Sequence, residues 1–418
     1  MSTFAYLFDL KNSVISIIIH RRHKNIKEVM AIIRKNIIKA IRQTDILLLL
    51  ITLALSILGT VMVSSATLSA DATSFFSRDA KVMVLALCLG ATAALIVSLI
   101  DYDIILKLWP LVAGGCLMLM LLLIPFGVAP PGRSDAISWF KIGSLYFQPS
   151  EIVKIGFIIT FAVHLSKVKN NISDFKNVMF LCIHAAIPIL LVIKTGDMGS
   201  ALIFGMMFIG MMYIAGVHWV YFPAGGLVIA AASPIIWLKV FDDIQRNRIL
   251  ALFNPEEYAT EIYQQNQALK AIRNGGFSGM GLFEGELTHS KLLPEKENDM
   301  IFSVVCEETG FIGAFILLTL FVLLALRVIQ VGKRSRNFAA EMMCYGVAFM
   351  IISQVIINIG MCTRLLPVIG ITLPFISAGG SSTVCLYLAV GIVLSVYRSS
   401  TGLGYENNYR FARIAREY

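Results

Sequence analysis

The sequence predicts an all-α polytopic membrane protein with about ten transmembrane helices, on the basis of its composition, its apolar runs and its lack of strand patterning. Of 418 residues, 57% are apolar and only 15% are charged, whereas soluble proteins carry charge on roughly a quarter of their residues. The run from Ile46 to Val63 is long enough to cross ~30 Å of hydrocarbon at ~1.5 Å per residue. The sequence lacks the alternation typical of outer-membrane barrels, so we expect helices, which satisfy their own backbone hydrogen bonds in lipid.

Ten largely apolar spans can be placed from hydropathy and turn residues. The expected ranges are 46–64, 81–100, 108–128, 151–165, 178–194, 199–217, 219–240, 301–326, 338–361 and 381–397. We therefore expect one membrane domain over 45–400, preceded by a basic segment at 1–44 and followed by a tail at 401–418.

Lysine and arginine predict the orientation of these spans. Segment 1–44 carries nine Lys/Arg against two acids, and segment 327–337 carries four with no acid. By the positive-inside rule both ends of the chain are cytoplasmic, and segment 242–300, between spans seven and eight, is a large extracellular loop. Basic and apolar residues alternate at helical spacing near the end of 1–44, which predicts an amphipathic helix against anionic membrane lipids. The net charge of +9 thus orients the protein and gives no support for nucleic-acid binding.

The fourth span opens with a cluster of polar residues, FQPSEIVK at 147–154. We expect Ser150 to cap the helix, with Glu151 and Lys154 on one face because they are three residues apart. Such an ion pair either satisfies itself or lines a polar cavity, and the sequence leaves both interpretations open.

Two parts of the large loop contain residues suited to ligand contact. Arg246 and Arg248 directly follow the seventh span, where a planar guanidinium suits phosphate oxygens, although interfacial snorkelling is the simpler interpretation. Four glycines lie within Gly275–Gly281 and let the backbone approach a ligand closely. This second signal is weak because flexible loops are equally rich in glycine.

Carboxylates stand at and inside the start of the eighth span. Asp299 is at its outer end, where an ionised aspartate can accept a proton from a sugar hydroxyl. Asp299 can instead cap the helix, and on the sequence alone capping is favoured. Glu307 and Glu308 lie further in, and carboxylates within a lipid-embedded helix are expected to find a cation or neutralise.

Segment 366–382 is apolar but contains two prolines and three glycines, so it cannot form one straight helix. We expect an irregular stretch buried in protein near the outer face, where freed backbone groups can meet a substrate. Gly379, Gly380 and Ser381 at its end are therefore candidate substrate contacts.

These motifs resemble the SEDS family (shape, elongation, division and sporulation), whose members include RodA, FtsW and SpoVE. The likeness covers roughly 45–400 and is carried by FQPSE-x-x-K, QRxRI, AIRNGGFSGMG, LPEKENDMIF, EETGFIG and LPVIGITLPFISAGGSS in that order. Within the family the chain is more similar to RodA of Gram-positive bacteria than to FtsW. Met300, Cys306 and Arg364 stand where the family usually has Phe, Gly and Gly.

The resemblance implies a peptidoglycan glycosyltransferase that polymerises lipid II at the outer face of the bacterial cytoplasmic membrane, working with a class B penicillin-binding protein. The family aspartate that is essential for polymerisation falls on Asp299 and favours a general base over a helix cap. The leaving lipid diphosphate needs a cation, for which Arg246, Arg248 and Mg²⁺ or another divalent ion are candidates.

Two other functions stay open from the sequence. In a lipid II flippase, Glu151, Lys154, Glu307 and Glu308 line a translocation path; in the glycosyltransferase, the same four residues are candidate substrate contacts. In a scaffold that only positions the penicillin-binding protein, replacing Asp299 has no effect.

Overall fold

The computed structural model describes residues 44–68, 77–129, 137–143, 145–290 and 292–400. The segments predicted at 1–44, apart from Thr44, and at 401–418 lie outside these residues. The long helices are α3 (Ile46–Thr67), α4 (Arg78–Leu99), α6 (Trp109–Phe126), α7 (Pro149–Val168), α8 (Phe175–Lys194), α9 (Met198–Ile214), α10 (Tyr221–Lys239), α14 (Ile301–Arg334), α15 (Phe338–Cys362) and α16 (Gly380–Ser400). Each of the ten expected spans thus coincides with one helix.

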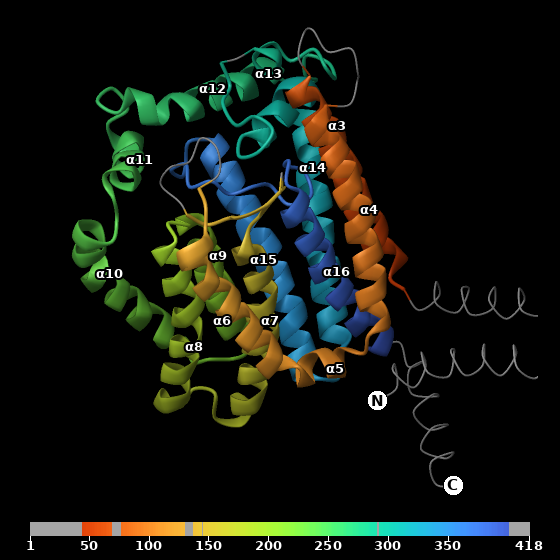
Figure 1. Cartoon of the computed structure of the whole chain (residues 1–418), viewed down its shortest axis with the longest axis vertical. Coiled ribbons are helices and arrows are strands. Elements are labelled where there is room, and N and C mark those ends of the chain that lie inside the picture. Colours follow the sequence, from red (N-terminus) through yellow and green to blue (C-terminus); the bar gives the residue numbers. More distant parts are fainter. Residues whose placement is uncertain (1–43, 69–76, 130–136, 144, 291, 401–418) are drawn as a thin grey trace, which may run out of the picture.

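The connecting segments contain shorter elements. They are α5 (Tyr102–Lys107), the 3₁₀ turn η1 (Lys169–Asn171), α11 (Asp243–Phe253), α12 (Ala259–Gly275), α13 (Glu286–His289) and an antiparallel hairpin of β1 (Phe140–Ile142) with β2 (Leu145–Phe147). Figure 1 shows α5 at one end of the bundle and α12 and α13 at the other. The large loop and the hairpin therefore lie at the end where segment 366–382 enters α16.

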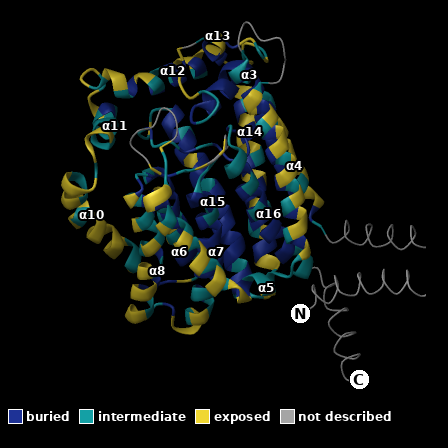
Figure 2. Cartoon of the chain, viewed as in Figure 1, coloured by how far each residue is buried: buried dark blue, intermediate teal, exposed yellow. Residues whose placement is uncertain are grey.

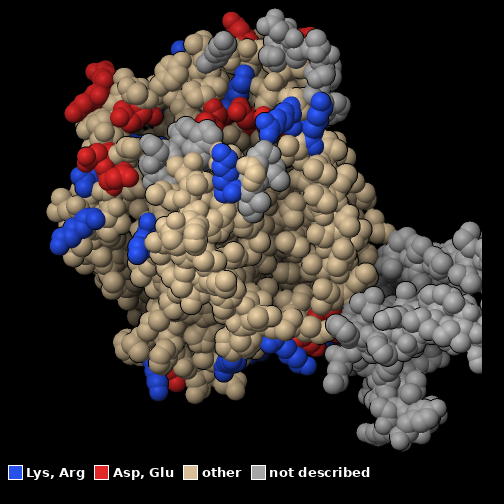
Figure 3. Space-filling view, in the orientation of Figure 1, with Lys and Arg blue, Asp and Glu red and all other residues tan. Residues whose placement is uncertain are grey.

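The protein is a multi-pass membrane protein. Eight of the described helices are long and apolar enough to cross a membrane; they do not include α9, which has 17 residues, or α7, whose first turns carry Glu151 and Lys154. In Figure 3 charged side chains gather at the two ends of the described surface, and a nearly uncharged band separates them. The number of spans and the cytoplasmic location of the α5 end stay predictions.

The core is formed mainly by α3, α7, α9, α14, α15 and α16 (Figure 2). Helix α4 packs along α16 at short range because small residues face each other: a Cβ on Gly391 would lie 2.9 Å from the backbone of Ala94. Small residues let membrane helices approach closely where no hydrophobic effect drives them together. The hydroxyls of Ser56 on α3 and Tyr387 on α16 form a hydrogen bond of 2.9 Å.

Helix α10 differs from this core, since none of its residues is buried. Figures 1 and 2 show it beside the bundle, connected through α11 to α12. Its apolar side chains are exposed, as lipid-facing side chains of a membrane helix are.

Helix α14 is broken at Gly310, which has φ 66° and ψ −163°. The glycine-rich turn after α12 fills the break: Met280 and Gly281 donate their N–H groups to the carbonyls of Glu307 and Glu308. A Cβ on Gly275 would lie 1.8 Å from the carbonyl oxygen of Cys306. The expectation that these glycines allow close approach to a ligand is corrected here, because what they approach is the backbone of α14.

Candidate active site

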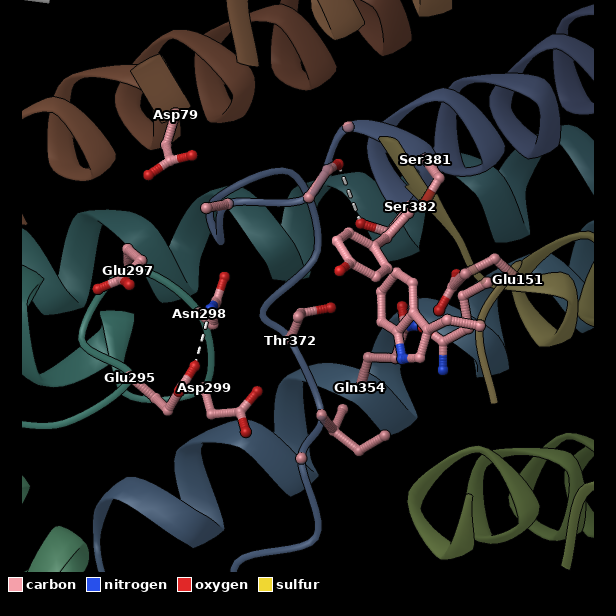
Figure 4. A pocket seen from close by; sticks show the side chains of 18 of the residues that line it. Asp79, Glu151, Glu295, Glu297, Asn298, Asp299, Gln354, Thr372, Ser381 and Ser382 are labelled. Atoms are coloured by element: carbon pink, nitrogen blue, oxygen red, sulfur yellow. Dashed lines mark hydrogen bonds between the residues drawn. The ribbon is translucent and has the colours of Figure 1, made fainter. Parts of the chain in front are cut away.

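A cavity of about 500 Å³ opens at the end of the bundle that carries the hairpin and the large loop. Its walls come from α4, the hairpin, the start of α7, the segment before α14, the middle of α15 and the segment before α16 (Figure 4). Elements far apart in the sequence therefore contribute to one space.

Asp299 lines this cavity with only 4% of its surface exposed. Helix α14 begins at Ile301, its N-cap is Met300, and no side chain makes the cap hydrogen bond. The capping interpretation of Asp299 is therefore wrong. The carboxylate belongs to the last turn before the helix, and Figure 4 shows it among the side chains around the cavity.

Asn358 holds the two walls beside Asp299 together. Its side-chain amide donates to the carbonyl oxygens of Asp299 and Ile371, each at 2.8 Å. Because Asn358 is fully buried on α15, both hydrogen bonds form out of water, where losing either would leave a carbonyl unsatisfied. The backbone that carries Asp299 is thus fixed to the core.

The irregular segment predicted over 366–382 is confirmed as the stretch between α15 and α16. It is attached to the Asp299 segment through the N–H of Ala378, which donates to the Glu297 carbonyl at 2.8 Å, and through the Ser377 hydroxyl, which donates to the Asn298 carbonyl at 2.6 Å. Gly379, Gly380 and Ser381 line the cavity, so the structure brings these three candidates together with Asp299.

Glu151 and Lys154 form a buried ion pair with Nζ 2.9 Å from Oε1, and Glu151 also lines the cavity. The two interpretations that the sequence left open therefore apply together. The cap expected at Ser150 is wrong, since α7 begins at Pro149 after Gln148 and the Ser150 hydroxyl donates to Asp197 at 3.1 Å.

Carboxylates dominate the charge around the cavity. Its acidic lining residues are Asp79, Glu151, Glu295, Glu297 and Asp299, and no Lys or Arg lines it among the described residues. Burial raises the pKa of Glu297, and the neighbouring carboxylates of Glu295 and Asp79 raise it further. The side-chain amide of Asn298 donates to Glu295 at 2.8 Å.

The two candidate arginines lie outside this cavity. The Arg246 guanidinium donates to the carbonyls of Trp237 and Phe241 at 2.9 and 2.8 Å, so it closes the end of α10. Arg248 lines a smaller cavity of about 70 Å³, which shares Gln148 with the larger one. Arg248 therefore lines a cavity that adjoins the acidic one at Gln148.

Glu307 and Glu308 do not line the cavity, although both are buried. Glu307 accepts from the backbone N–H groups of Leu287 and Thr288 at 2.9 and 2.7 Å and from the Thr288 hydroxyl at 2.7 Å. Glu308 accepts from the Ser65 hydroxyl. Neutral donors of the large loop thus surround Glu307, and Lys296 donates to the carbonyl of Thr288 next to it; the expectation that Glu307 finds a cation or neutralises stays a prediction.

Within the described part of the chain, no group of three or more His, Cys, Asp or Glu residues is arranged to hold a metal ion. We therefore derive no step through a metal held by the protein.

Several lining residues were not identified from the sequence. Asp79 comes from the first turn of α4, and Gln354 from the middle of α15. Glu295 and Glu297 belong to the same acidic motif as Asp299, which was a usable signal. For Gln354 the signal was its position four residues before Asn358, on the same helix face.

The chain matches the family model for FtsW, RodA and SpoVE, described as cell cycle protein, over residues 45–402. It is 34% identical to the probable peptidoglycan glycosyltransferase FtsW of Geobacter sulfurreducens, with 86% of this chain and 96% of that protein covered. It is 32% identical to the peptidoglycan glycosyltransferase MrdB of Escherichia coli K12 over 68% of this chain and 75% of that protein. It is 33% identical to stage V sporulation protein E of Bacillus subtilis over 85% and 97%.

Solved structures share the fold. A chain from a peptidoglycan synthase complex that coordinates polymerization and crosslinking superposes with a TM-score of 0.72 at 24% identity, covering 85% of this chain and 98% of that chain. The crystal structure of the rod shape determining protein RodA of Thermus thermophilus gives a TM-score of 0.64 at 24% identity, with 85% and 97% covered.

Proposed function

This chain belongs to the FtsW, RodA and SpoVE family, and from that premise we propose that it is a peptidoglycan glycosyltransferase that polymerises lipid II, with Asp299 as its general base. The relatives FtsW and MrdB are named as peptidoglycan glycosyltransferases. The observation that carries the residue assignment is that Asp299 lines the acidic cavity and does not cap α14.

In the proposed reaction the Asp299 carboxylate takes the proton of the acceptor's sugar 4-hydroxyl. The hydroxyl oxygen forms a bond to the anomeric carbon of a lipid-diphosphate-linked glycan. The bond from that carbon to the diphosphate oxygen breaks, and lipid diphosphate leaves with the electron pair. One displacement with inversion needs one base, unlike the paired carboxylates of retaining glycosidases.

The surrounding residues have positioning roles in this proposal. Glu151, which Lys154 holds in a buried ion pair, and the backbone at Gly379, Gly380 and Ser381 contact the substrate at the cavity wall. Arg248, which lines the adjoining cavity, is the described cation best placed for the diphosphate, since guanidinium matches phosphate geometry. Arg246 is assigned the weaker role because backbone carbonyls already accept from its guanidinium.

A divalent cation such as Mg²⁺ would supply charge neutralisation on the leaving diphosphate. The described residues offer it no site of three or more ligands, so we propose that any such ion arrives bound to the substrate. Polymerisation that stops when a chelator is added would support this role.

We also propose a class B penicillin-binding protein as the partner. The support is the similarity to a chain of a complex that coordinates polymerization and crosslinking, since a glycan strand needs a separate crosslinking activity. Transport of lipid II has less support: of the four residues expected along a translocation path, only Glu151 lines the cavity.

The test is polymerisation of purified lipid II by the reconstituted chain, with and without its partner. Asp299→Asn keeps the size and hydrogen-bonding capacity of the side chain but removes the base, so we expect it to lose polymerisation while inserting and folding normally. Asp45→Asn is the matched control, because Asp45 is equally buried but pairs with Arg327 at 2.7 Å, among the helices at the opposite end. Translocation without polymer by the wild type would contradict the proposal.

A further inference from the structure

Gln354 of α15 leaves a buried acceptor without a partner. Its side chain lines the acidic cavity, the residue is 3% exposed, and its Oε1 makes no hydrogen bond. Buried polar atoms are satisfied in the great majority of cases, because leaving one unsatisfied costs free energy. An orphaned acceptor on a cavity wall indicates a ligand that supplies the missing donor.

Two other buried oxygens in the described part of the chain also lack a hydrogen-bond partner, and they differ from that of Gln354 in their position. Within the described residues, Oε1 of Gln267 and Oε2 of Glu308 are the remaining buried side-chain oxygens without a partner. Neither of these residues lines the cavity. Of these three residues, only Gln354 therefore belongs to the wall of a cavity in which a ligand can bind.

The position of Gln354 on α15 fixes its relation to Asp299. Gln354 is four residues before Asn358, which holds the Asp299 carbonyl at 2.8 Å, and residues four apart share a helix face. At about 1.5 Å of rise per residue, Gln354 lies roughly 6 Å further along α15 toward the centre of the bundle. Gln354 and the residue that holds Asp299 therefore lie about one turn apart on one face of α15.

The chemistry of the missing partner follows from the acceptor. An amide oxygen is neutral, and a full positive charge placed against it in a buried site would be poorly compensated. Cations are better served by the carboxylates of Asp79, Glu295 and Glu297 elsewhere on the same walls. The partner at Gln354 is therefore a neutral N–H or O–H donor.

We propose that Gln354 forms a substrate subsite, in which its Oε1 accepts a hydrogen bond from a neutral donor on the sugar held beside Asp299. The amino sugars of peptidoglycan carry two such donors, the acetamido N–H and the ring hydroxyls. The subsite rests on the proposed function for the identity of the sugar. The unpartnered oxygen and its place on the cavity wall are independent of that function.

The first experiment measures polymerisation kinetics of Gln354→Met, which keeps the side-chain size but has no acceptor oxygen. We expect kcat/KM for lipid II to fall about tenfold, mainly through KM, which corresponds to about 1.4 kcal/mol. Gln354→Asn retains an amide acceptor without adding charge and should lose less than Gln354→Met. Gln267→Met is the matched control and should leave kcat/KM unchanged. Wild-type kinetics in Gln354→Met, or an equal loss in Gln267→Met, would overturn the subsite.

A second experiment is independent of turnover. In the Asp299→Asn background, lipid II should raise the melting temperature of the protein, and adding Gln354→Met should reduce that rise. If the difference persists although the wild type does not polymerise lipid II, the subsite stands while the proposed reaction fails; an equal rise in both would overturn the subsite.

A lipid II analogue with an ester oxygen in place of the acetamido nitrogen identifies the donor. If Gln354→Met loses nothing further with this analogue, the donor is the N–H. If Gln354→Met lowers kcat/KM for the analogue by the same factor as it does for lipid II, the donor is a hydroxyl.

Discussion

The segment before α14 and the first turns of α14 both carry buried carboxylates, yet they are built for different purposes. At the cavity wall, Asp299 is held through its backbone by Asn358, and its carboxylate borders open space. Two turns further, Glu307 accepts two backbone N–H groups and a hydroxyl from the large loop. A buried acid that accepts hydrogen bonds from the large loop holds that loop in place, whereas one on the wall of a cavity can meet a substrate.

The largest effect on stability is expected where the large loop meets the break in α14. Gly275→Ala would place a Cβ 1.8 Å from the backbone oxygen of Cys306, which neither segment can avoid without moving. We expect the free energy of unfolding to fall by at least about 3 kcal/mol, measured as a lower melting temperature in detergent.

Gly114→Ala is the matched control for that substitution. Gly114 is also helical, but a Cβ there would meet nothing within 4 Å, so the melting temperature should be unchanged or slightly higher. If both variants melted with the wild type, the tight contact between the loop and α14 would be contradicted.

A smaller loss is expected from Glu307→Leu, which has a side chain of similar size but accepts none of the hydrogen bonds from Leu287 and Thr288. Unsatisfied donors should lower the free energy of unfolding by about 2 kcal/mol and expose the loop to proteolysis. The polymerisation rate per folded molecule should fall only indirectly, because the large loop moves when Glu307 no longer holds it. A Glu307→Leu protein that is stable but inactive would contradict a purely structural role and would indicate that Glu307 takes part in the reaction.

The smallest effect is a pH dependence from the cavity wall. Burial, followed by the neighbouring Glu295 and Asp79, raises the pKa of Glu297 in the folded protein, with Lys296 acting in the opposite direction. The folded protein therefore holds this proton more tightly than the unfolded chain, so the resulting stability is lost as the pH rises through the raised pKa.

Glu297→Gln should consequently match the wild-type melting temperature in acid and exceed it at neutral pH. The difference should stay below about 1 kcal/mol, because the group is partly screened by solvent. A melting-temperature difference that shrinks as the pH rises would show that the sign is wrong.

Much of the fold was predictable because apolar length is sufficient to locate membrane helices. The break in α14 was not, since Gly310 in a helical pattern does not show that a distant loop will supply the missing hydrogen bonds. Arg364 gave a better signal: it stands where the resembled family usually has glycine, and its φ is 64°, a conformation in which non-glycine residues are strained.

The site was predictable where one motif contains the whole arrangement, as for Asp299 and for Gly379, Gly380 and Ser381. The site was not predictable where the packing of distant segments determines what a side chain contacts. Glu307 and Asp299 look alike as carboxylates near a helix start, and only the position of the large loop separates them. Gln354 reads as an ordinary polar residue in α15 until the cavity beside it is known.

The central claim is tested most directly by measuring polymerisation rate per folded molecule and melting temperature together for Asp299→Asn at saturating lipid II. We expect the rate to fall by about 10² to 10⁴, the usual contribution of a general base, with a melting temperature close to that of the wild type. A protein that polymerises at the wild-type rate, or one that loses activity only because it unfolds, would contradict the account.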